Sequence, residues 1–206
     1  MDRPYVVGID IGGQSAKIGI VDTRGTVLSQ TAIKSNDTNS HEEFIENLCS
    51  AVEKLAEKAN IPMSKIRGIG IGAPNANYYT GTIENAVNLT FGGMKVIPFA
   101  DLMSERIGLP VRLTNDANAA AVGEMTYGAA RGMKNFITIT LGTGVGSGIV
   151  VGGYVLYGHD GFAGELGHVT MVRKNGRLCG CGKTGCLEAY ASATGVARTA
   201  RELLET

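Results

Sequence analysis

The chain has 206 residues, of which 44% are hydrophobic and 18% charged, and its 19 basic residues balance its 19 acidic residues. This length and composition allow a soluble globular protein with one substantial core or two smaller ones. Lysine and arginine never gather into a basic stripe, so neither nucleic acid nor an anionic membrane is an expected partner. The sequence has no long apolar run and no signal-peptide pattern, which predicts a cytoplasmic protein without membrane attachment.

The first half of the chain predicts one α/β domain, residues 1–116. Strands are expected at residues 5–11, 16–21, 26–33, 66–71 and 111–114. Ser40 and Glu43 have the spacing of a capping box ahead of an amphipathic helix that ends near Lys58. A polar loop is expected at 73–88, followed by a short helix that Pro98 opens.

The second half, residues 117–206, predicts a partial domain of the same type. After a helix at 117–127, strands are expected at residues 136–141, 148–151 and 154–157, and two helices follow to residue 204. A strand, a glycine turn and a second strand occur at 10–20 and again at 138–151. This recurrence indicates a duplicated fold.

Two glycine-rich segments each join two predicted strands. The first is Asp10-Ile11-Gly12-Gly13-Gln14-Ser15, and the second begins with Gly142-Thr143-Gly144. Successive backbone N–H groups in such turns can converge on an anion because no Cβ intervenes, and Asp10 can hold Mg²⁺ through its waters. Neither segment opens a helix, and no Walker lysine-serine pair occurs, which excludes Rossmann and P-loop sites. Plain hairpin turns are the alternative.

A histidine and three cysteines predict a structural zinc site. His168, Cys179, Cys181 and Cys186 offer four nitrogen and sulfur ligands, and the glycines at 180, 182 and 185 let a short loop fold around a metal. A cytosolic cluster of this kind indicates a metal rather than a disulfide. Three incidental cysteines beside a histidine are the alternative, and Cys49 is expected in the core.

A third group contains polar residues that suit a sugar. Asp116, at the entry to a helix, can accept a hydroxyl proton during phosphoryl transfer, or it can simply cap the helix. Glu165 and Glu188 flank the predicted metal ligands, so a zinc ion would fix both carboxylates toward one cleft. Carboxylates that converge in this way can accept hydrogen bonds from the hydroxyls of a polyol.

Together these motifs resemble the ROK family, the bacterial sugar kinases and repressors of the actin-like ATPase superfamily. The resemblance rests on the segments 10–13, 115–120, 141–146, 164–168 and 179–190, and it spans nearly the whole chain in family order. It implies an actin-like (ribonuclease H-like) α/β fold with an N-terminal domain and an incomplete second domain. Family chains are longer, so the resemblance also implies truncation at the C-terminus.

The resemblance implies ATP-dependent phosphorylation of a hexose, with glucose to glucose 6-phosphate as the leading reaction. N-acetylmannosamine, N-acetylglucosamine or fructose is the alternative substrate, and a catalytically silent sugar-binding protein or fragment is the alternative function. Asp116 would be the general base, and His168 would bind zinc with one ring nitrogen and sugar with the other. A homodimer or larger homo-oligomer is expected. The implied sugar-binding residues are Asn115, Asp116, Glu165, His168 and Glu188. The implied residues for ATP and Mg²⁺ are Asp10, Gly12, Gly13, Gln14, Ser15, Gly142, Thr143 and Gly144.

The sequence departs from the family pattern at two positions in the first half. Gln14 stands where the family usually has threonine, and Asn75 stands where it usually has glycine. Repressors of the family add an N-terminal helix-turn-helix, whereas the first predicted strand begins here at Tyr5. This difference favours the enzyme over the repressor.

Overall fold

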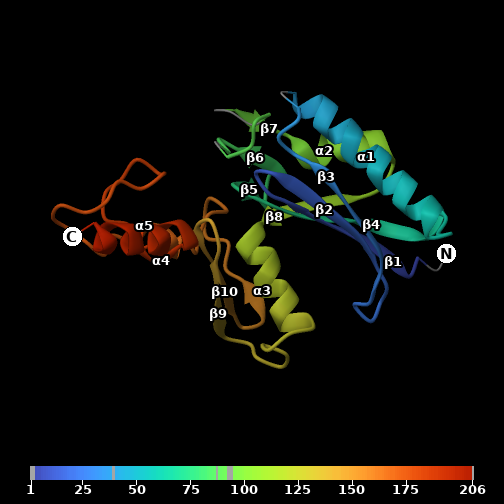
Figure 1. Cartoon of the computed structure of the whole chain (residues 1–206). Helices are drawn as coiled ribbons and strands as arrows, with labels where there is room; N and C mark the ends of the chain where they lie inside the picture. The colour runs from blue at the N-terminus through green and yellow to red at the C-terminus, as the bar shows by residue number, and fades with distance from the viewer. Residues whose placement is uncertain (1–2, 39, 87, 92–94, 206) are drawn as a thin grey trace. The chain divides into compact units, whose positions relative to one another are not determined.

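The computed structural model describes residues 3–38, 40–86, 88–91 and 95–205 (Figure 1). They form two compact units, residues 1–119 and 120–206, and the division falls within helix α3 (Asp116–Thr126). The domain boundary predicted at 116/117 lies in the same helix. The assignment of two domains stays a prediction.

The first unit is built on a five-stranded mixed sheet. Its strand order is β3-β2-β1-β4-β8, in which β1 pairs antiparallel with β2 and parallel with β4. The β2–β3 pair is antiparallel and the β4–β8 pair is parallel. The five strands are β1 (Tyr5–Ile11), β2 (Ser15–Val21), β3 (Val27–Lys34), β4 (Ile66–Ala73) and β8 (Val111–Asn115). The carboxyl ends of β1, β4 and β8 therefore share one edge of the sheet, where Asp10 and Asn115 lie.

Helices α1 (His41–Lys58) and α2 (Phe99–Ile107) cover one face of this sheet (Figure 1). The apolar stripe of α1 is buried as the sequence predicts, and Phe44 stacks on Phe91 with ring centroids 4.4 Å apart. Cys49 lies in the same buried stripe, which confirms its expected place in the core. The Ser40 hydroxyl caps α1 by accepting the Glu43 N–H at 3.4 Å.

A small sheet takes two of its three strands from the segment 73–88, where the sequence predicted only a polar loop, and its third strand from the residues before Pro98. It consists of β5 (Ala76–Asn77), β6 (Thr82–Glu84) and β7 (Val96–Ile97), and a 3₁₀ turn, η1 (Met63–Lys65), precedes β4. Strands of two or three residues are too short to show an alternating pattern, so the sequence analysis missed them.

Asn75, one of the two departures from the family pattern, has a structural explanation in this small sheet. Its φ is +52°, a left-handed conformation that asparagine tolerates better than most residues other than glycine. Its side-chain N–H donates to the carbonyl of Glu84 at 2.9 Å, and its own carbonyl accepts the Glu84 N–H at 3.0 Å. Asparagine can therefore replace glycine here and also brace the β5–β6 turn.

The second unit contains a three-stranded antiparallel sheet in the order β11-β10-β9. Leu141 pairs with Val145 at the end of the β9–β10 hairpin, so β10 begins three residues earlier than predicted. This hairpin repeats the form of β1–β2. The elements of the unit after α3 are β9 (Phe136–Leu141), β10 (Val145–Val151), β11 (Tyr154–Val155), the 3₁₀ turn η2 (Leu166–His168), α4 (Glu188–Ala191) and α5 (Ala193–Leu204).

One face of β9 exposes apolar side chains. Ile137, Ile139 and Leu141 are 54%, 48% and 67% exposed, whereas Val150 on the neighbouring strand is 1% exposed. A sheet in water normally places its polar residues outward, so this face is an apolar surface that the described residues do not cover. Among the described residues, no helix has the length and apolar character to cross a membrane.

We expect the exposed face of β9 to bind a hydrophobic dye. Replacing Ile137 and Ile139 with threonine should lower dye fluorescence at least two-fold and leave the free energy of unfolding nearly unchanged, because the side chains are exposed and threonine suits a strand. The control Val150→Thr places a hydroxyl in the core and should cost about 1–3 kcal/mol of stability. Unchanged dye fluorescence in the double variant would show that this surface is covered in solution.

Candidate functional site

The first glycine turn is held by hydrogen bonds to its carbonyl groups. The Gly12 N–H donates to the Ser15 carbonyl at 3.0 Å and closes the turn between β1 and β2. The buried Ser35 donates its hydroxyl to the Gly12 carbonyl at 2.6 Å and its N–H to the Gln14 carbonyl at 3.1 Å. Three carbonyls of the turn, those of Gly12, Gln14 and Ser15, are therefore already bound, and the turn has a defined shape without any ligand.

Gly13 is a glycine because another segment of backbone comes close to it. A Cβ at this position would lie 2.8 Å from the Asn88 carbonyl oxygen, closer than real Cβ contacts. Its φ is not positive, so the need for glycine is one of space rather than of a left-handed backbone. The exposed Gln14 uses its backbone in the turn, as the contact with Ser35 shows.

The second glycine turn, between β9 and β10, rests on the start of α5. The Ala193 N–H donates to the Gly142 carbonyl at 2.8 Å, and the Thr194 hydroxyl donates to the Thr143 carbonyl at 3.1 Å. Within the turn, the Gly142 N–H donates to the Gly144 carbonyl at 3.0 Å. As in the first turn, other groups bind the carbonyls, which is the arrangement expected where N–H groups are to face an anion.

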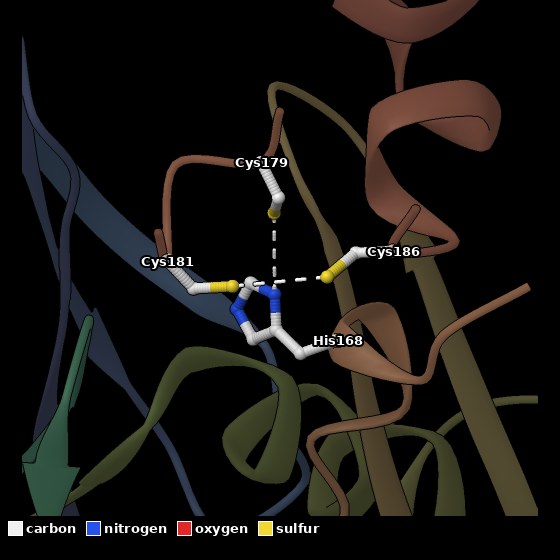
Figure 2. A group of neighbouring side chains, drawn as sticks. All are labelled: His168, Cys179, Cys181 and Cys186. Atoms are coloured by element: carbon white, nitrogen blue, oxygen red, sulfur yellow. Dashed lines mark hydrogen bonds between the residues drawn. The ribbon is translucent and has the colours of Figure 1, made fainter. Parts of the chain in front are cut away.

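Figure 2 shows that His168, Cys179, Cys181 and Cys186 point toward one another. Their ligand atoms all lie within 4.8 Å of one another. The Cys179 Sγ lies 3.6 Å from the His168 Nδ1, and the Cys181 Sγ lies 3.7 Å from the Cys186 Sγ. A tetrahedral zinc site requires about 3.6 Å between sulfur and nitrogen and about 3.8 Å between two sulfurs, from its usual bond lengths. The four residues therefore fit a zinc ion, with Nδ1 as the histidine ligand.

Two glycines allow the segments that carry these ligands to pack closely. A Cβ on Gly167, next to His168, would overlap the Val145 carbonyl oxygen of β10, at 2.1 Å. A Cβ on Gly185, next to Cys186, would overlap the Val172 carbonyl oxygen, at 1.9 Å, and the φ of Gly185 is +78°. Only glycine fits at both positions, so local packing fixes the backbone on either side of the cluster.

Arg177 anchors the cysteine loop to the two C-terminal helices. Its guanidinium donates to the carbonyls of Ala189 and Gly195 and forms an ion pair with Glu202, and it lies 4.7 Å from the centre of the Tyr190 ring. With its side chain only 12% exposed, Arg177 is a largely buried charge with several partners. It fixes the loop that begins at Cys179 relative to α4 and α5.

The thiols of the cluster differ in acidity. Burial raises the pKa of the Cys179 thiol to about 12. Desolvation also acts on Cys181, but the Lys183 backbone N–H and hydrogen bonds from Cys179 and Cys186 outweigh it and lower the pKa of that thiol. A bound zinc ion would hold both sulfurs as thiolates. Cys179 is therefore unsuited to be a reactive nucleophile without a metal.

Asn115 and Asp116 lie at the junction of β8 and α3, and Asn115 provides the cap. The Asn115 Oδ1 accepts the Ala117 N–H at 2.9 Å, which is the contact of a side-chain cap, and α3 begins at Asp116. The Asp116 Oδ1 accepts the same N–H at 2.8 Å. Since Asn115 already caps the helix, capping alone does not explain why position 116 is an aspartate.

The Asp116 carboxylate is harder to ionise than an ordinary aspartate. Desolvation by the surrounding protein raises its pKa, and the negative charge of Asp10 adds to the effect, while the Ala117 N–H opposes it. The residue nevertheless keeps access to solvent. A carboxylate with a raised pKa that a ligand can reach has the properties of a general base.

In the second unit, Glu188 lies between the metal cluster and the second glycine turn. Its Oε2 accepts the Val145 N–H at 2.9 Å, and its Oε1 lies 3.7 Å from the Cys179 Sγ. Glu165 is exposed and directly precedes η2, where its carbonyl accepts the His168 N–H at 3.1 Å. The structure thus brings Glu188 to the cluster, as expected for a residue that flanks a metal ligand.

The sequence analysis did not identify several groups that shape these sites. The carbonyl of Asn88 and the N–H of Val145 act through the backbone, so their residue types carry no signal. Gly167 did carry a sequence signal, because it lies in the Gly164–His168 motif beside a predicted ligand. Lys183, which donates to the His168 carbonyl at 3.0 Å, lies in the cysteine motif in the same way.

Comparisons with known proteins agree with this picture. The model of the ROK family matches residues 6–206. A glucokinase of Halalkalibacterium halodurans is 45% identical over 98% of this chain and 60% of its own length. A xylose repressor of Caldicellulosiruptor bescii is 31% identical over 99% of this chain and 50% of its own length.

Among solved structures, a ROK family glucokinase from Streptomyces griseus in complex with glucose and AMPPNP superimposes with a TM-score of 0.81. It is 37% identical, and the match covers 96% of this chain and 60% of that chain. The present chain thus spans about 60% of the length of the glucokinases that it matches.

We predict that the chain binds one zinc ion through His168, Cys179, Cys181 and Cys186. Metal analysis of protein purified without added zinc should find close to one zinc per chain, and Cys181→Ser should lose most of it because a ligand is removed. Cys49→Ala, a change of the lone core cysteine, is the matched control and should keep its zinc. A Cys181→Ser variant that retains full occupancy would contradict the assignment.

Proposed function

Because the chain belongs to the ROK family and has its actin-like ATPase fold, we propose that it binds a hexose and MgATP and transfers the γ-phosphoryl group to the sugar. The relatives named glucokinase support a sugar kinase, and glucose is the leading substrate, with glucose 6-phosphate as the product. N-acetylmannosamine, N-acetylglucosamine and fructose are the alternatives. The observation that carries the proposal is Asp116, a carboxylate with a raised pKa whose capping role Asn115 already fills.

In this proposal, four residues accept hydrogen bonds from sugar hydroxyls. They are Asn115, Asp116, Glu165 and Glu188. The His168 Nδ1 faces Cys179, so the Nε2 is the ring nitrogen that can serve the sugar. A neutral polyol suits such a set, because carboxylate and amide oxygens accept from hydroxyls without requiring a charged ligand.

Asp116 then acts as the general base. As the sugar oxygen approaches the γ-phosphorus, its O–H bond breaks and the proton passes to the Asp116 carboxylate. The new O–P bond forms while the bond to the β-phosphate oxygen breaks, and ADP leaves with that electron pair. Phosphoryl transfer requires little else from the protein except positioning and stabilisation of charge.

We assign the nucleotide phosphates to the two glycine turns. Asp10, Gly12, Gly13, Gln14 and Ser15 form the first turn, and the second consists of Gly142, Thr143 and Gly144. Asp10 would hold Mg²⁺ through its waters, where the ion neutralises charge on the transferring group. The zinc ion would have a structural role, holding His168 and the cysteine loop in place. A cytoplasmic location and a homo-oligomeric assembly complete the proposal.

A sugar-binding repressor is the second candidate, since a xylose repressor is among the relatives. Such a protein needs the hydroxyl-binding residues but not a base. Asn115 already caps α3, so Asp116 is not needed for capping, and its pKa is raised. Both observations favour the kinase. Phosphorylation of any hexose would decide between them.

We predict that Asp116→Asn lowers kcat by about two to four orders of magnitude, the range for loss of a general base, and changes sugar affinity much less. An amide of the same shape can still hydrogen-bond but cannot take the proton. A coupled assay over a panel of hexoses, on this chain and on any longer protein that carries it, provides kcat, and calorimetry provides the affinity. Near-normal turnover in the variant would remove Asp116 from the mechanism.

Stability provides the control for this substitution. The pKa of Asp116 is raised in the folded state, so its ionised form disfavours folding at pH values above its unfolded pKa. Asp116→Asn should therefore be at least as stable as the parent at pH 7. Any gain should shrink as the pH falls through the raised pKa of the folded state and should vanish below the unfolded pKa. Loss of activity without loss of stability would show that the effect is chemical.

The first glycine turn yields a separate prediction. Gly13→Val should abolish detectable MgATP binding, because a branched side chain would stand where the backbone approaches both an anion and the Asn88 carbonyl. Gly8→Ala is the matched control, since a Cβ there meets nothing within 4 Å. Unchanged ATP affinity in a folded Gly13→Val variant would mean that the turn is only a hairpin. Sugar affinity should survive in both variants.

A further inference from the structure

The Glu188 carboxylate is bonded to the backbone of the second glycine turn. Its Oε2 accepts the Val145 N–H at 2.9 Å, from the first residue of β10. Its Oε1 is directed toward the metal cluster, 3.7 Å from the Cys179 Sγ. Glu188 is also the first residue of α4, so a helix start fixes its backbone. One carboxylate thus touches two parts of the second unit, the start of β10, which is 43 residues away from Glu188 in the sequence, and the cysteine loop.

This carboxylate explains why residue 144 is a glycine. A Cβ there would lie 2.5 Å from the Glu188 Oε2, and the φ of Gly144 is not positive. The requirement is therefore for space beside the carboxylate. Because the Oε2 is at the end of a flexible side chain, an alanine at 144 would displace the Glu188 carboxylate and leave the turn itself in place.

A neighbouring glycine behaves differently. A Cβ on Gly142, in the same turn, would meet nothing within 4 Å. The turn therefore contains one glycine that touches Glu188 and one that does not. This difference provides a matched pair of substitutions for separating the role of the carboxylate from the role of the turn.

We propose that Glu188 is a positioning residue that couples the sugar site to the second phosphate turn. The inference rests on the proposed function, in which Glu188 accepts a sugar hydroxyl. A hydroxyl bound to one carboxylate oxygen holds the carboxylate where its other oxygen bonds the Val145 N–H. Sugar binding therefore stabilises the turn in the form that receives phosphate, and by linkage the nucleotide strengthens sugar binding by the same factor.

The test compares Gly144→Ala, Gly142→Ala and Glu188→Ala by calorimetry with glucose in the absence of nucleotide. If Gly144 served only the phosphates, its substitution would not affect sugar binding under these conditions. We expect Gly144→Ala to weaken sugar binding at least five-fold, the lower end of typical couplings, and Gly142→Ala to leave it within about two-fold. In a Glu188→Ala background, Gly144→Ala should have no further effect. Equal sugar affinities for Gly144→Ala and the parent would overturn the proposal.

A second measurement does not depend on sugar. Hydrogen exchange of the Val145 amide should be slow in the parent and at least about ten-fold faster in both Gly144→Ala and Glu188→Ala, because the N–H loses its acceptor. Zinc content shows that each variant is folded. Unchanged exchange would refute the positioning contact even if sugar binding fell. If the parent bound none of the hexoses, the proposed function would fail, while the exchange result would still decide the contact.

Discussion

His168 and three cysteines, Cys179, Cys181 and Cys186, converge in a part of the second unit that has little regular secondary structure. The stretch from 169 to 187 lies between η2 and α4. Among the described residues, its regular structure is limited to isolated β-bridges. His168 lies just before this stretch, and Cys186 lies near its end, two residues ahead of Glu188. A bound zinc ion would supply folding free energy where regular secondary structure does not. In that case the cluster would also set where α4 begins and where the Glu188 carboxylate lies.

Glycines in this protein mark close contacts as much as turns. Gly13, Gly144, Gly167 and Gly185 each face an atom that a Cβ would approach within 3 Å. For three of them that atom is a backbone carbonyl oxygen, and for Gly144 it is a carboxylate oxygen. The sequence shows that glycine is needed in these segments, and a phosphate-binding turn is a sound interpretation. It does not show which neighbour imposes the need, because that neighbour is distant in sequence.

Much of the fold could be predicted from the spacing of apolar residues and from the positions of glycine and proline. The strand at 5–11 and the helix at 41–58 each have a clear pattern of apolar residues, and the structure confirms both elements. The β5–β7 sheet was missed because its strands have two or three residues. The metal cluster was predictable because its ligands lie close in sequence, whereas the contact of Asn88 with the first turn was not. Asn75 departs from the family pattern, and its left-handed backbone explains why asparagine can stand where the family usually has glycine.

We propose that a hexose binds with one of its hydroxyls at Asp116. A crystal structure of the zinc-loaded chain grown with glucose would show this contact directly. We predict a sugar hydroxyl oxygen within about 3 Å of an Asp116 carboxylate oxygen, the reach of a general base. Glucose bound at a place where none of its hydroxyls contacts Asp116 would contradict the assignment of Asp116 as the general base.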